Sequence, residues 1–101
     1  GVEYCDGFPQ VGAVVTQVNS DWSVAPVAEW INKEVTIRVS RSGDALTIRA
    51  GINSDLRLVR VAPLDPTRAW QAGPMFCAPT RAGLKITFTN WSTGEADSTL
   101  H

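Results

Sequence analysis

The sequence predicts an all-β chain folded as an antiparallel β-sandwich. Apolar and polar residues alternate along several short runs, which is typical of half-buried strands. Clusters of Gly, Pro, Asn and Asp separate these runs, as turns separate strands. Only residues 27–33, which follow Pro26, have the pattern of a helical turn. Short strands at regular spacing favour a sandwich or barrel meander over a mixed fold.

The clearest local feature is a hairpin. Apolar residues occupy every second position of residues 35–40 and again of residues 46–49. Ser42-Gly43-Asp44 lies between the two runs, and a short Gly-containing loop suits a tight turn.

In residues 56–61 the alternation slips by one position, which predicts a β-bulge near Leu58 or Val59.

The remaining runs define the extent of the domain. We expect further strands at 1–5, 11–18, 22–26, 56–62, 70–77 and 84–91. Residues 1–91 then form the sandwich domain, and residues 92–101 form a polar tail that we expect to be frayed.

Composition restricts the possible partners. The chain has 101 residues, of which 44% are hydrophobic and 19% charged, as in a soluble globular domain. The net charge of −1 gives no attraction to nucleic acid or to an anionic membrane. No apolar run approaches the roughly 20 residues that span a bilayer. The first residues lack the features of a signal peptide, so we expect a cytoplasmic protein.

The two cysteines, Cys5 and Cys77, are too few for a disulfide scaffold. In a reducing cytoplasm they are expected to behave as small hydrophobic residues that are not bonded to each other. A free-thiol titration of the native protein should therefore detect both.

Several sequence blocks together resemble one known family. The most specific are Ser20-Asp21-Trp22-Ser23 and Gly73-Pro74-Met75 with Cys77 and Pro79; the others are Gly1-Val2-Glu3-Tyr4, Val14-Val15-Thr16, Ile37-Arg38-Val39, Arg41-Ser42-Gly43-Asp44 and the strand around Phe88. Their order resembles the C-terminal half of the regulation-of-enolase family, of unknown function. The resemblance implies a concanavalin A-like, jelly-roll-like sandwich in a partial version, a cytoplasmic setting and a loose link to sugars. It brings no catalytic residues, and Asn53-Ser54-Asp55 departs from the Asp-Gly hairpin usual in the family.

The residue inventory argues against catalysis. A glycosidase needs two carboxyl groups at a fixed separation, and on one strand these occupy alternate positions. Glu3 is the best candidate, but its alternate neighbours are Gly1 and Cys5. The one histidine, His101, ends the chain, so neither a nucleophile–histidine pair nor a metal cluster is evident. We therefore expect no enzyme, no cofactor and no catalytic residue, with calcium binding through separate loops left open.

The aromatic content points to binding. Four tryptophans are many for this length, and flat aromatic faces suit sugar rings when carboxylate and amide groups lie nearby. Residues 19–23 combine these groups in one turn, although core packing is the common role of a tryptophan. Arg38 and Glu3 are expected either to join that loop or to form a surface ion pair. The predicted ligand-binding residues are Glu3, Asn19, Asp21, Trp22, Ser23 and Arg38.

Two functional hypotheses follow. The first is a non-catalytic sandwich that binds a carbohydrate or another small polar ligand. The alternative is a structural module that assembles through its sheet faces or edges, with no small-molecule site. Because a partial sandwich leaves apolar faces and strand edges open, the sequence predicts a homodimer.

Overall fold

The chain is all-β, as the sequence predicts. The computed structural model describes residues 1–77, 82, 83 and 85–97, and the side chain of Cys5 lies outside the described part. Two three-stranded antiparallel sheets account for the regular structure of these residues, together with one short 3-10 helix. The elements are β1 (Val2–Cys5), β2 (Phe8–Thr16), β3 (Ser20–Pro26), η1 (Ala28–Trp30), β4 (Val35–Ser42), β5 (Ala45–Ile52) and β6 (Asp55–Pro63).

The first sheet is the meander β1-β2-β3. Asp6 and Gly7 join β1 to β2, and both have positive φ (56° and 88°), as a tight two-residue hairpin turn requires. Val2 pairs with Val11 on one side of β2, and Trp22 pairs with Val14 on the other. This register fixes which side chains share a face of the sheet.

The second sheet is the meander β4-β5-β6 and contains the predicted hairpin. Gly43 and Asp44 join β4 to β5, and Gly43 takes a φ of 60°. The predicted bulge is also confirmed. Ile48 pairs with Arg60 and the next residue, Arg49, pairs with Leu58, so Val59 is the extra residue in β6.

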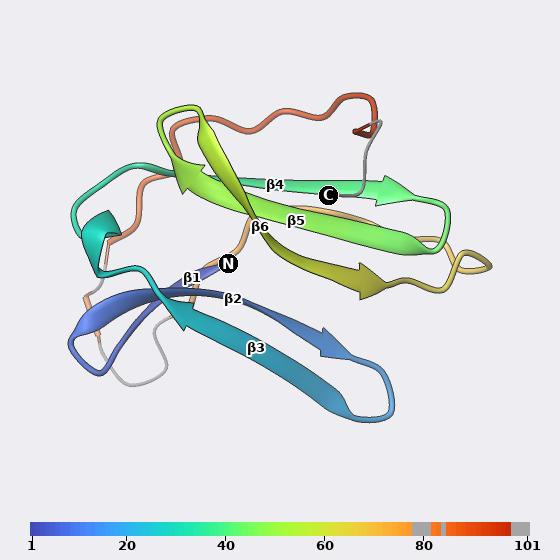
Figure 1. The fold of residues 1–101 in the computed structure, drawn as a ribbon, viewed down its shortest axis with the longest axis horizontal. Coiled ribbons are helices and arrows are strands. Elements are labelled where there is room, and N and C mark those ends of the chain that lie inside the picture. Colours follow the sequence, from blue (N-terminus) through green and yellow to red (C-terminus); the bar gives the residue numbers. More distant parts are fainter. Residues whose placement is uncertain (78–81, 84, 98–101) are drawn as a thin grey trace.

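The core lies where the two sheets meet. Figure 1 shows the sheets as separate layers, connected at one end by η1 (teal), which is the predicted helical turn. The first sheet contacts the second through β2 and β6. Val11, Val27, Trp30 and Ala50 form the buried cluster, with Val35, Ile52 and Val59 packed against it. The small core depends mainly on Trp30 because it is the largest member.

The predicted strands at 70–77 and 84–91 are wrong for the residues described. Residues 70–77 and 85–91 have no regular secondary structure, and residue 84 lies outside the description. Alternation shows that a segment can form a strand, but a strand also needs a free edge with which to pair its backbone groups. The two segments instead meet through side chains, with the rings of Phe76 and Phe88 6.2 Å apart. The concanavalin A-like strand order stays a prediction.

The polar tail is attached at Asp97, so the expectation of a frayed tail is wrong there. The backbone N–H of Asp97 donates to Ser40 Oγ at 2.7 Å, and its carboxylate pairs with Arg38 and Arg49. Figure 1 shows the last described segment (orange to red) passing along the β4 side of the second sheet. Residues 98–101, including His101, lie outside the described part.

Cys77 is an exposed, free cysteine. The predicted absence of a bond between Cys77 and Cys5 stays a prediction for the thiol titration, because the side chain of Cys5 is not described.

Candidate ligand-binding surface

The candidate site is on the face of the first sheet turned away from the core. Val11 and Ala13 are buried on the core side of β2, so the residues that alternate with them point outward. Gly12 is one of these outward residues, and Val14 is the next. The register places Glu3 of β1 and Trp22 of β3 on this same outer face, on either side of β2. Two of the predicted binding residues therefore share one surface.

A shallow pocket of about 180 Å³ occupies this surface. Gly12 lies on β2 between the positions of Glu3 and Trp22, and an added Cβ there would lie only 2.2 Å from the carbonyl oxygen of Ser23. Trp22 is 61% exposed, so a face of its indole ring is available to solvent. The full lining consists of Gly1, Val2, Glu3, Gly12, Ala13, Val14 and Trp22.

The polar groups of the pocket are the Glu3 carboxylate and the amino group of Gly1. The amino group donates a hydrogen bond to the carbonyl oxygen of Gly12 at 2.8 Å. Burial lowers the pKa of the Gly1 amino group, and the nearby Glu3 carboxylate opposes this effect. The pocket thus combines an aromatic face with an acidic hydrogen-bond acceptor.

Asp21 and Ser23 do not join this pocket. They alternate with Trp22 along β3, so they lie on the opposite, core-facing side of the sheet. Arg60 of β6 binds the Asp21 carboxylate at 2.9 Å and also donates to Ser23 Oγ at 3.4 Å. These two predicted binding residues therefore connect the two sheets. Both Asp21 and Trp22 are exposed, with the Asp21 side chain 69% accessible, but of the two only Trp22 lines the pocket.

The other two predicted residues lie elsewhere. Arg38 is on β4 of the second sheet and pairs with Asp97, so it takes up neither of the two expected alternatives, joining the 19–23 loop or pairing with Glu3. Asn19 is in the turn between β2 and β3, where its carbonyl oxygen accepts from Gln17 N–H at 3.1 Å. The six predicted residues are thus divided among an outer pocket, an inter-sheet contact, a turn and the second sheet.

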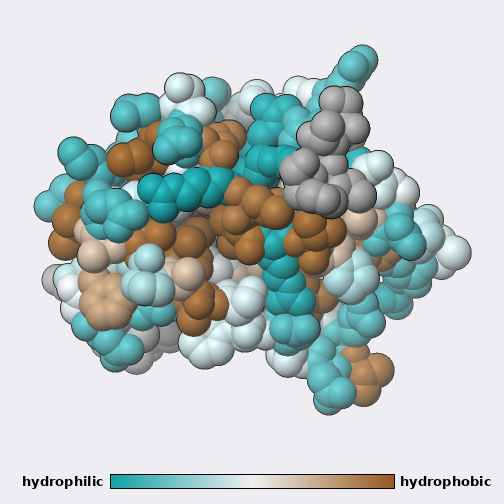
Figure 2. Space-filling view, viewed as in Figure 1, coloured by the Kyte–Doolittle hydropathy of each residue, from teal (hydrophilic) through white to brown (hydrophobic). Residues whose placement is uncertain are grey.

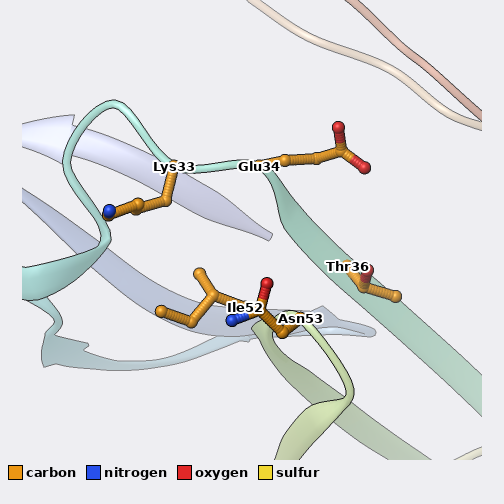
Figure 3. A pocket seen from close by; sticks show the side chains of 5 residues that line it. All are labelled: Lys33, Glu34, Thr36, Ile52 and Asn53. Carbon is orange, nitrogen blue, oxygen red and sulfur yellow. The ribbon is translucent and has the colours of Figure 1, made fainter.

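A larger hollow of about 330 Å³ lies at one end of the second sheet. Figure 3 shows that its side chains do not converge, because the Glu34 carboxylate points away from Lys33 and Ile52. Its lining, which Figure 3 labels, is Lys33, Glu34, Thr36, Ile52 and Asn53. With no aromatic face and no set of groups aimed at one point, this hollow is a weaker candidate than the Trp22 pocket.

The described residues contain no group of three or more His, Cys, Asp or Glu side chains placed to hold a metal ion. No helix in this part of the chain has the length and apolarity that crossing a membrane requires.

Sequence reasoning missed three residues that shape these surfaces. Gly12 looks like an ordinary interruption of an apolar run, and its role depends on the strands that flank it. Arg60 follows the slip in alternation in residues 56–61, which was a usable signal that its side chain faces the core. Asp97 offers no signal, because nothing local in a polar segment shows which sheet it contacts.

Comparison with known proteins identifies the family. Residues 1–96 match the family described as Protein of unknown function (DUF1349). The chain is also 37% identical to Regulation of enolase protein 1 of Saccharomyces cerevisiae over 105 residues, which covers all of this chain and 52% of the yeast protein. The chain thus spans about half the length of this curated relative. No solved structure matches the chain significantly. The chain therefore belongs to the DUF1349 family of proteins of unknown function.

Proposed function

We propose that the chain is a non-catalytic module that binds a small polar ligand of the carbohydrate type on the outer face of the first sheet. One observation carries this proposal: the exposed indole of Trp22 shares a pocket with the Glu3 carboxylate. A tryptophan exposed on a sheet face leaves an apolar ring in water, and covering that ring is favourable.

The pocket chemistry suits a sugar ring. The C–H face of a pyranose can stack on an indole, while a carboxylate accepts hydrogen bonds from the ring hydroxyls. The volume of about 180 Å³ is below the roughly 300–1,000 Å³ typical of drug-sized sites. We therefore expect the pocket to take one sugar ring and to bind it weakly, with a Kd on the order of 1 mM.

Replacement of Trp22 tests the proposal. The Trp22→Ala variant should weaken binding of a monosaccharide or short oligosaccharide at least about tenfold, because it removes the stacking surface. Binding would be followed by ligand-observed NMR across a panel of neutral sugars. The matched control is Trp91→Ala, which removes an exposed tryptophan from outside the pocket and should leave binding unchanged. Equal effects of the two substitutions, or no binding by the native chain, would refute the proposal.

A cytoplasmic setting is part of the same proposal. The exposed free thiol of Cys77 supports it, because such a thiol persists most readily in a reducing compartment.

A second candidate function is self-assembly into a homodimer. It is favoured by apolar residues that lie on the core-facing side of β4 and are nevertheless exposed. Ile37 pairs with the buried Ala50, so Ile37 and its alternate neighbour Val39 point to the core side of β4. Val39 is nevertheless 58% exposed, because β4 is an edge strand that the first sheet does not cover. Figure 2 shows apolar side chains (brown) gathered across the middle of the visible face. A second copy of the chain would bury such surface.

The oligomeric state decides this candidate. The native chain should sediment as a dimer at micromolar concentration, and Val39→Lys should raise the dimer dissociation constant about 100-fold by placing a charge in the apolar contact. Val18→Lys is the matched control, since Val18 lies almost fully exposed in the turn between β2 and β3. A monomeric native chain would exclude dimerisation as the function.

A further inference from the structure

One arginine of the second sheet contacts both chain neighbours of Trp22. Arg60 of β6 donates from Nη1 to Asp21 Oδ1 at 3.1 Å, and its Nη2 lies 2.9 Å from Oδ2 of the same carboxylate. Nη1 also donates to Ser23 Oγ at 3.4 Å. Asp21 and Ser23 face the second sheet, while Trp22 between them lines the outer pocket. The guanidinium group therefore holds β3 on either side of the residue that supplies the indole ring.

The β-bulge at Val59 turns Arg60 toward the first sheet. With the extra residue, Arg60 pairs with Ile48, which lies on the same face of β5 as the buried Ala50. Without it, Val59 would take that position and Arg60 would lie opposite Thr47, on the outer face of the second sheet. Val59 packs against the core in the bulged strand as well. The bulge thus adds an inward arginine while keeping the inward valine.

β3 gains local order from such a contact because it is an edge strand. Its backbone pairs with β2 on one side, and all seven of its residues are exposed. The second sheet packs on the first through β6 and β2 (Figure 1), so β3 lies beside this contact and Arg60 supplies a polar link to it. The Arg60 side chain is only 17% exposed, so water competes little for its guanidinium group. Arg60 is therefore well placed to restrain the backbone that bears Trp22.

We propose that Arg60 is a positioning residue for the outer pocket: it orders Trp22 through Asp21 and Ser23, and so makes ligand affinity depend on the contact between the two sheets. This inference rests on the proposed function, in which the Trp22 indole stacks on a sugar ring. Because the Asp21 carboxylate is 69% exposed, added salt weakens its attraction to Arg60. Affinity for a neutral sugar should therefore fall as ionic strength rises, although the sugar has no charge to screen.

The mobility of β3 tests the proposal without any ligand. In Arg60→Met, which keeps an apolar stem, NMR relaxation should show the order parameters of the amides of residues 21–23 falling from about 0.85 toward about 0.6. The indole N–H of Trp22 should become more mobile with them. Arg41→Met is the matched control, because it removes the same charge from an arginine that donates to the Gly43 carbonyl oxygen within its own hairpin.

Both variants would be measured well below their unfolding transitions. A merely structural role of Arg60 would lower the unfolding free energy of Arg60→Met and leave the mobility of residues 21–23 equal to that in Arg41→Met. That result overturns the proposal.

Glucose, followed by ligand-observed NMR, tests the effect on binding. Arg60→Met should weaken glucose binding at least about threefold, as the loss of a partly exposed ion pair allows. Raising sodium chloride from about 0.05 M to about 1 M should weaken binding to the native chain by a similar factor and leave Arg60→Met unaffected. Adding Asp21→Asn to Arg60→Met should cause no further loss, because the two side chains act as one unit.

The outcomes separate this inference from the proposed function. If the native chain binds glucose and Arg60→Met binds it equally well, the positioning role is refuted while the sugar site stands. If the native chain binds no neutral sugar, the proposed function fails, and the mobility of residues 21–23 decides whether Arg60 controls the order of Trp22.

Discussion

The Trp30→Ala variant is expected to lose about 4 kcal/mol of unfolding free energy, within the roughly 3–5 kcal/mol range for Trp-to-Ala changes in cores. Trp30 is 3% exposed and is the largest member of a cluster whose other residues are Val11, Val27 and Ala50. Truncation would open a cavity that these small side chains cannot fill. Because single domains are stable by only about 5–15 kcal/mol, the loss should be a large share of the total.

Urea denaturation followed by far-ultraviolet circular dichroism measures this loss. Trp30→Phe is the informative control, because the indole N–H of Trp30 has no hydrogen-bond partner among the described residues and Phe keeps most of the ring. Its expected cost is about 1 kcal/mol, some of it from the weaker contact with Arg57, whose guanidinium lies 5.9 Å from the indole centroid. If the alanine and phenylalanine variants are equally stable, the core is not organised around this side chain.

Alternation was sufficient to predict the elements that form hairpins. In β4 and β5 the period of two, the Gly43 turn and the pairing partner all lie within 18 consecutive residues, so local sequence contains the whole element. The bulge at Val59 was predictable for the same reason. A slip in alternation can be reconciled with one continuous buried face only by an extra residue.

The segments after β6 could not be predicted in this way. Residues 85–91 alternate as regularly as β4 does, but the described chain brings no strand edge into register with them. Pairing with a distant edge is a property of the whole fold, and propensity alone does not specify it. The same limit applies to Asp97, whose partners Arg38 and Arg49 lie 59 and 48 residues earlier in the chain.

The candidate site was partly predictable. The sequence identified Trp22 and Glu3, which both line the outer pocket. An aromatic ring and a carboxylate can be recognised as possible binding groups whichever face of a strand they lie on. It also grouped Trp22 with Asp21, which strand geometry separates onto opposite faces. Adjacent residues can share a site in a loop but not on one face of a strand. The error therefore came from treating residues 19–23 as a turn when β3 begins at Ser20.

The Gly51→Ala variant is expected to lose about 3 kcal/mol of unfolding free energy, at the upper end of the cost of overpacking a protein interior. Gly51 is buried in β5, and a Cβ atom there would lie 1.9 Å from the carbonyl oxygen of Asp55 and 3.1 Å from the Cα of Leu56. Both are backbone atoms, so no side-chain rotation can relieve the overlap. The end of the β5–β6 hairpin must move instead, which disturbs the pairing of Gly51 with Leu56 and of Ile52 with Asp55.

Gly73→Ala provides the matched control for this variant, because an added Cβ at Gly73 meets no atom within 4 Å and its φ is not in the left-handed region. Its unfolding free energy should stay within about 0.5 kcal/mol of the native value, as for most exposed substitutions. Urea denaturation of the three proteins gives the comparison, and amide exchange should show the added loss of protection in Gly51→Ala concentrated in β5 and β6. A Gly51→Ala variant as stable as Gly73→Ala would mean that this hairpin end moves at little cost, so the close approach of β5 to Asp55 would not constrain the sequence.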